Sequence, residues 1–64
     1  MVLLKTNRNS YDRNEAAKYS MTVGELIEEL SHCKLDDKIV FCNDNGHTYG
    51  DIQPNRIKQV LTRP

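Results

Sequence analysis

Four residues in this sequence have side chains that bind zinc or act as nucleophiles: His32, Cys33, Cys42 and His47. A structural zinc site needs four such ligands arranged as a tetrahedron. A hairpin after Cys42 can bring that thiol close to His47. However, successive residues of a helix point about 100° apart, so His32 and Cys33 do not face one ion together. We therefore expect no metal ion and no other cofactor, and two reduced, packed thiols.

The same hairpin offers Cys42 and His47 as a nucleophile and its base. A thiolate nucleophile requires an electropositive, accessible site with an oriented base. Asp44 and Asp51 would surround this thiol with negative charge instead. Because no other stretch matches a catalytic motif, we expect that the protein is not an enzyme.

The Asn-Asp-Asn-Gly run at 43–46 is similar to part of a calcium-binding loop. Such a loop needs oxygen ligands at alternate positions before the glycine and a glutamate six residues after it. Phe41 and Ile52 stand at two of these positions. The run is therefore interpreted as a hairpin turn and not as a calcium site.

Charge is unevenly distributed along a chain whose formal net charge is zero. Residues 1–20 carry four basic and two acidic side chains, a balance of +2. Residues 21–46 carry two basic and six acidic ones, a balance of −4, and residues 47–64 return to +2. A nucleic-acid-binding protein usually has a clear basic excess. This distribution favours a protein partner over nucleic acid.

Two charged sets are candidates for partner binding. One acidic row on a helix can recognise a basic groove, including one that otherwise holds nucleic acid: Glu25, Glu28 and Glu29. As the alternative, the basic residues of the first twenty, interleaved with Tyr11 and Tyr19, can pair with phosphates while the tyrosines stack on bases: Lys5, Arg8, Arg13 and Lys18.

One helix must position the acidic row, and its start is specified by the sequence. Thr22 and Glu25 have the spacing of a capping box, and Met21 and Leu26 have that of a hydrophobic staple. Apolar residues then recur at three- and four-residue spacing: Val23, Leu26, Ile27, Leu30 and Cys33. This pattern predicts an amphipathic helix over 22–33.

A β-hairpin is expected after this helix. Residues 38–42 predict a strand, because β-branched, aromatic and sulfur side chains follow Lys38 without interruption. Asn45-Gly46 suits the two positive φ angles of a type I′ turn, lengthened by the two preceding residues. Residues 47–52 are therefore expected to return as the antiparallel partner strand.

The ends of the chain are less clearly specified. Residues 2–6 are interpreted as a short strand or an extended arm. Within residues 7–20, Asp12 and Glu15 can start a short helix, and a partly ordered loop is the alternative. Residues 56–62 are expected to form a last strand, with a short helix as the alternative.

These elements predict a single small α+β domain over residues 1–64, with 1–20 as a partly flexible N-terminal arm. One amphipathic helix packs on a small antiparallel sheet of about three strands. Such a sheet has open edges, which are templates for another chain. We therefore expect a homo-oligomer in which Val60 and Leu61 contact a second copy.

The composition is that of a folded protein, with 38% hydrophobic and 28% charged residues. No apolar run approaches the roughly 20 residues of a membrane-spanning helix. The opening Met-Val-Leu-Leu is too short for the core of a signal peptide. A cytoplasmic location without a membrane partner is expected.

Residues 21–52, MTVGELIEELSHCKLDDKIVFCNDNGHTYGDI, resemble small proteins of bacteriophages and other bacterial mobile elements. The shared pattern is a Met-Thr-Val-x-Glu-Leu helix, an Asp-containing turn, a hydrophobic strand and a return containing Gly and Tyr. The resemblance covers about half of the chain and carries no catalytic motif. It implies a non-enzymatic protein-interaction module, in a class that includes inhibitors of host factors such as defence systems.

Overall fold

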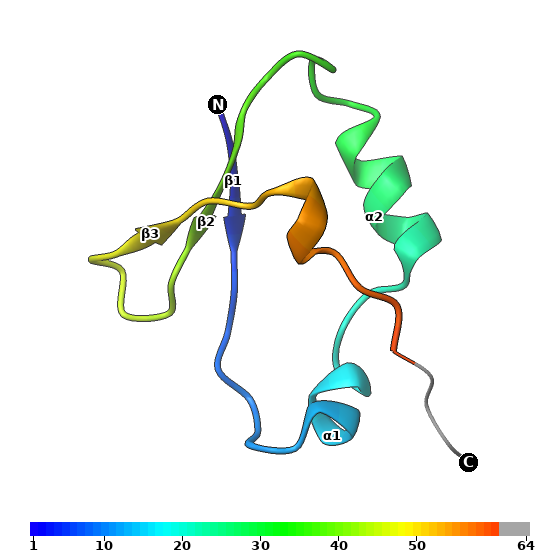
Figure 1. Cartoon of the computed structure of the whole chain (residues 1–64), viewed down its shortest axis with the longest axis vertical. Helices are drawn as coiled ribbons and strands as arrows, with labels where there is room; N and C mark the ends of the chain where they lie inside the picture. Colours follow the sequence, from blue (N-terminus) through cyan, green and yellow to red (C-terminus); the bar gives the residue numbers. More distant parts are fainter. Residues whose placement is uncertain (61–64) are drawn as a thin grey trace.

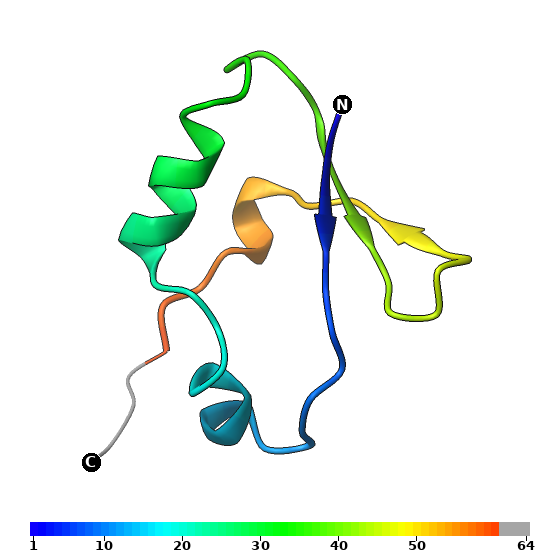
Figure 2. The same ribbon diagram turned by 180° about the vertical axis from the view of Figure 1, so that it is seen from behind.

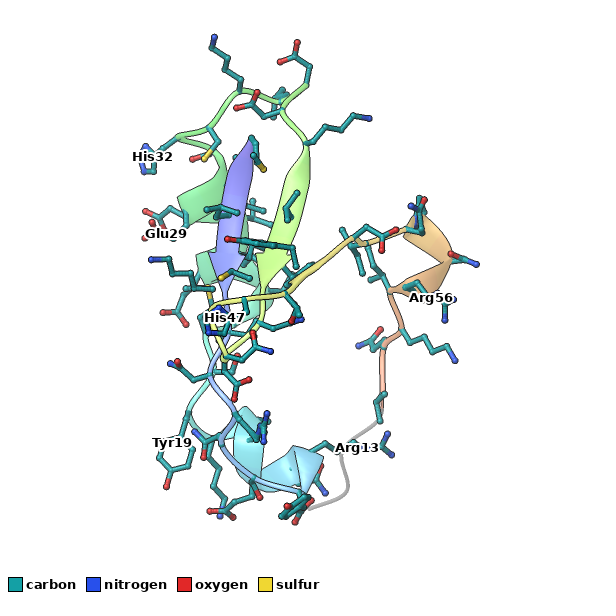
Figure 3. All side chains as sticks on the ribbon, turned by 90° about the vertical axis from the view of Figure 1, so that its left-hand side faces the viewer. Arg13, Tyr19, Glu29, His32, His47 and Arg56 are labelled. Atoms are coloured by element: carbon teal, nitrogen blue, oxygen red, sulfur yellow. The ribbon has the colours of Figure 1, made fainter. Side chains whose placement is uncertain are left out.

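The computed structural model describes residues 1–60. In chain order its elements are β1 (Val2–Lys5), α1 (Arg13–Ala17), α2 (Val23–Leu30), β2 (Ile39–Cys42), β3 (Tyr49–Gly50) and the 3-10 helix η1 (Pro54–Arg56). The strands form one sheet in the order β1-β2-β3. Helix α2 stands off one face of the sheet, on the side of β1 (Figures 1, 2 and 3). The coarse α+β architecture expected from the sequence is present.

β1 is an edge strand that runs parallel to the central strand β2. Its register places Val2 opposite Ile39 and Leu4 opposite Phe41. Parallel neighbours need a long crossover connection, which residues 6–38 provide with both α-helices. Of the two alternatives given for residues 2–6, the short strand is present, at Val2–Lys5. The expectation of an antiparallel sheet was wrong, because β1 joins the sheet in parallel.

The hairpin between β2 and β3 is antiparallel, as predicted, but its return strand is short. Phe41 pairs with Gly50 and Cys42 with Tyr49. The side-chain oxygen of Asn45 accepts the amides of His47 at 2.8 Å and of Thr48 at 3.1 Å. These two residues therefore belong to the turn, and the predicted strand over 47–52 is reduced to two residues.

The turn itself is not the predicted type I′. Gly46 has a φ of 74°, and no non-glycine residue among those described has a positive φ. The Gly46 amide donates to the Asn43 carbonyl at 3.0 Å, and the Asn43 amide donates to the Thr48 carbonyl at 3.1 Å. Gly46 is thus the one left-handed residue, at the end of a four-residue turn over 43–46, where the prediction required two left-handed residues.

Helix α2 begins as the sequence predicted. The Thr22 hydroxyl accepts the Glu25 amide at 3.1 Å, and the Glu25 carboxylate accepts the Thr22 amide at 3.0 Å. This capping box satisfies two amides that a helix start otherwise leaves unpaired. The helix is shorter than predicted, because it ends at Leu30 and residues 31–33 continue in tighter turns.

Helix α1 settles the alternative left open for residues 7–20. Asp12 caps it by accepting the Asn14 amide at 3.0 Å. Lys18 pairs with Glu15 at 3.0 Å over the helix end. A short helix is therefore present where the sequence allowed either a helix or a loop.

The last strand predicted over 56–62 is wrong in its described part. Pro54 opens η1, a single 3-10 turn that ends at Arg56. Ile57 is extended, but residues 57–60 pair with no strand of the described sheet. Figure 3 shows η1, with Arg56 labelled, displaced from the sheet and from α2. Residues 61 and 62 lie outside the described part of the chain.

The chain has no closed hydrophobic core within residues 1–60. None of these residues is buried, and the best-covered apolar side chains are only partly shielded. The accessible surface is 6443 Å². A folded monomer of 7.4 kDa has about 4,200 Å², so the excess is about 2,200 Å². Even if the four residues outside the described part contribute their full unfolded surface of about 700 Å², an excess of about 1,500 Å² remains.

The dimensions agree with this open packing. The Cα radius of gyration is 13.1 Å, whereas a compact chain of this length has about 10.7 Å. No Cα atom of α2 comes within 8 Å of a Cα atom in any of the three strands. The predicted packing of the helix on the sheet therefore stays a prediction. No helix in the described residues is long and apolar enough to span a membrane.

Candidate functional site

An open groove of about 1120 Å³ lies between β1 and α2. We call it the β1–α2 groove. One wall is formed by residues 2–6 together with Phe41 of β2. The end of α1 and the loop after it contribute Ala16, Ala17, Tyr19, Ser20 and Met21. The opposite wall comes from four side chains on α2 and just after it: Leu26, Glu29, Leu30 and Cys33. The groove is thus mainly apolar, with Glu29 and Lys5 as its charged members.

The groove runs along the unpaired edge of β1. The Val2 amide donates to the Lys38 carbonyl at 2.8 Å, and the Thr6 amide donates to the Cys42 carbonyl at 3.2 Å. Backbone groups of successive strand residues point to opposite sides, so those of Leu3 and Lys5 point away from β2. No strand of the described sheet pairs with this side. The groove therefore offers unpaired backbone donors and acceptors beside apolar side chains.

Apolar side chains lie on both faces of the sheet at this edge. Val2 and Leu4 are half-buried and share a face with Ile39 and Phe41. Leu3 points to the other face, where 46% of it is exposed. A segment added beside β1 can therefore bury side chains on both of its faces.

The apolar side chains predicted to form one face of α2 point in two directions. Leu26, Leu30 and Cys33 are half-buried and line the groove. Val23 and Ile27 are 77% and 64% exposed, and neither lines the groove. Only part of the predicted apolar face of the helix therefore turns toward β1.

The three acidic candidates have different environments. Glu25 is occupied in the capping box. Its hydrogen bond from the Thr22 amide, with a smaller contribution from the Thr22 side chain, lowers the pKa of Glu25 below the ordinary value of 4.5. Glu28 is exposed and does not line the groove, whereas Glu29 does. Glu29 is thus the one member of the row placed to contact an occupant.

The basic candidates are not gathered into one surface. Arg8 binds Asp44, with 3.0 Å between its Nε and Oδ2. Lys18 is paired with Glu15. Lys5 lines the β1–α2 groove, and Arg13 opens α1, apart from it (Figure 3). Because two of the four cations already have carboxylate partners, the arrangement favours nucleic-acid binding less than the sequence alone did.

The C-terminal candidates are only partly described. Val60 is 47% exposed, and Ile57, another apolar residue of the strand predicted over 56–62, is 74% exposed. Leu61 lies outside the described residues. Residues 57–60 thus present apolar side chains without belonging to any helix or strand.

The zinc-type residues are not brought together. Both cysteines are free thiols and half-buried. His47 lies on the β2–β3 hairpin, whereas His32 follows α2 (Figure 3). Within residues 1–60, no three His, Cys, Asp or Glu side chains are grouped closely enough to hold one metal ion.

The sequence analysis missed β1 as a wall of the site. Its signal was the run Val2-Leu3-Leu4, followed by a helix and then by the buried-type strand at 38–42. A strand, helix and strand in that order are typical of a parallel pair with a crossover. Because residues 7–20 are polar, residues 1–20 were grouped as an arm, although a short strand over 2–6 was one of the two interpretations.

Comparison with known proteins adds no relative. No family model, no curated protein and no solved structure gives a significant match to this chain.

Proposed function

We propose that the chain is a non-enzymatic interaction module that binds an extended polypeptide segment in the β1–α2 groove. The observation that carries this proposal is the edge of β1 that no described strand pairs with, beside an apolar groove, where none of residues 1–60 is buried. A strand added to a sheet edge gains main-chain hydrogen bonds, and its side chains enter pockets on either side. This mode needs no catalytic group.

The packing of the helix against the sheet is completed by binding. A neighbouring strand lies about 4.8 Å from its partner, and the Cα atoms of α2 stay more than 8 Å from those of β1. We infer that a strand added at the outer edge of β1 contacts Leu26 and Leu30, because both side chains line the groove beside this edge. The gain from burying these apolar groups offsets the cost of ordering the bound segment.

Charge selects the kind of segment. Helix α2 carries three glutamates and no basic residue, and Glu29 lines the groove. An extended segment in which basic residues flank an apolar one is attracted, and an acidic segment is repelled. Inhibition of a host factor stays a prediction of the phage-like resemblance, and it requires a host protein that exposes such a segment.

A fluorescence-polarisation assay with labelled hexapeptides tests this proposal. Basic-apolar peptides should bind, whereas acidic-apolar and wholly polar peptides should not. Glu29→Lys should weaken the binding of basic peptides, mainly through the association rate and most strongly at low salt. Glu28→Lys is the matched control, because it makes the same charge change on the same helix outside the groove.

Generic DNA and RNA belong in the same assay at two salt concentrations. The proposal expects no binding tighter than about 10 μM. If the chain binds no peptide and instead binds nucleic acid at micromolar concentration with a steep salt dependence, the alternative function is correct.

A further inference from the structure

We propose that the occupant of the β1–α2 groove is residues 56–60 of a second copy of this chain, added as a strand along the free edge of β1. The inference rests on the proposed function and names its partner. It arises from two features of the same chain: an open groove and an extended segment, neither of which has a partner among the described strands. No described strand fills the groove, and residues 57–60, which carry the apolar side chains Ile57 and Val60, pair with no described strand.

The side chains of the segment match the groove. Ile57 is extended, with a φ of −96° and a ψ of 117°. Because strand side chains alternate, Ile57 and Val60 enter on opposite faces. Both faces are apolar at this edge, with Leu30 on the helix side and Leu3 on the other. A segment with an apolar residue on each face is therefore buried on both.

The charges of the segment and the groove are complementary. Arg56 and Lys58 flank Ile57, and the described segment 54–60 carries no acidic residue. The wall that it would meet contributes Glu29 from a helix that is otherwise acidic. Attraction between them favours the segment over an acidic one of similar apolar content.

The exposed area is sufficient for a stable dimer. Each chain has about 1,500 Å² more accessible surface than a compact monomer of its mass, after about 700 Å² is set aside for the four residues outside the described part. Stable interfaces bury about 800 Å² on each partner, so about half of the excess is enough. In a reciprocal exchange, each copy gives its segment and receives the other's, which makes a closed two-fold dimer.

Sedimentation equilibrium of the full chain tests the inference. The wild-type protein should be a dimer at micromolar concentration. Ile57→Asp and Val60→Asp should each raise the dimer dissociation constant at least about tenfold, because a carboxylate then enters an apolar groove without a partner. Tyr11→Asp, at a fully exposed side chain that does not line the groove, is the matched control and should leave the constant unchanged.

Two further arms identify the surfaces. An excess of a peptide with the sequence of residues 55–60 should convert the wild-type dimer to monomers. Glu29→Lys should weaken the dimer, and combining it with Lys58→Glu in the same chain should restore it.

The outcomes separate this inference from the proposed function. A chain that stays monomeric at millimolar concentration but still binds basic-apolar hexapeptides overturns the inference and leaves the proposed function standing. A dimer that both aspartate variants leave intact places the interface elsewhere and also overturns it. A chain that neither dimerises nor binds peptides contradicts both proposals.

Discussion

Arg8 joins the end of β1 to the β2–β3 hairpin by binding Asp44 with both branches of its guanidinium. Its Nε lies 3.0 Å from one carboxylate oxygen, and its Nη2 lies 3.3 Å from the other. The two residues are 36 positions apart in the chain. The pair therefore connects the loop after the parallel strand β1 to the turn of the antiparallel hairpin, and it gives Arg8 a carboxylate partner.

We predict that this pair contributes modestly to stability. Arg8 is largely exposed, and exposed ion pairs contribute about 0–1 kcal/mol. A double-mutant cycle with Arg8→Gln and Asp44→Asn, measured by urea unfolding, should give a coupling energy in this range that disappears in 1 M salt. Arg13→Gln is the control. A coupling well above 2 kcal/mol would mean that the pair is shielded from solvent, contrary to the structure.

The capping box predicts a pH dependence of α2. Because the pKa of Glu25 is lowered in the folded chain, its contribution is fully present above the ordinary value of 4.5 and is lost as the pH falls through the lower folded value. Helix content measured by circular dichroism should fall over that acid range. In Glu25→Gln this component should be absent, since the glutamine does not titrate.

The capping box also shows which parts of a short sequence can be interpreted reliably. Thr22 and Glu25 contact each other through three residues of chain, so their types and spacing determine the outcome. The same holds for Asp12 at the start of α1 and for Gly46 in the turn. Each of these local features was found in the structure, although the type I′ geometry assigned to Asn45 was wrong.

Contacts distant in sequence were not predictable in the same way. The pairing of Leu4 with Phe41 depends on the crossover between the two strands. The types and spacing of its polar residues do not predict the direction that the chain takes. Residues 56–62 have apolar side chains suited to a strand, but no neighbouring edge pairs with the described ones. Their strand preference requires a partner, because β-propensity mainly reflects packing on adjacent strands. The acidic row was likewise treated as one surface, although the capping box predicted from the spacing already engages Glu25.

The thiols provide a probe of the groove. Cys33 lines it, whereas Cys42 does not. In a Cys42→Val chain, alkylation of Cys33 should slow as the protein concentration rises and the groove becomes occupied. In a Cys33→Ala chain, the rate at Cys42 should not depend on concentration. The double replacement should remain folded, and Cys33 that reacts equally fast at all concentrations would show that nothing covers the groove.

Leu30 tests whether association completes the core. It is half-buried in the single chain and lines the groove opposite β1. In dilute protein, Leu30→Ala should therefore lower the free energy of unfolding by about 1 kcal/mol or less, because little covered surface is lost. At concentrations where the groove is filled, the same change should cost about 2–5 kcal/mol, as expected for a buried leucine. Urea unfolding at two protein concentrations measures this difference. Ile27→Ala, on the exposed side of the same helix, should cost little at either concentration. A large, concentration-independent loss at Leu30 would mean that the helix already packs within one chain. No loss at either concentration would mean that the groove stays empty.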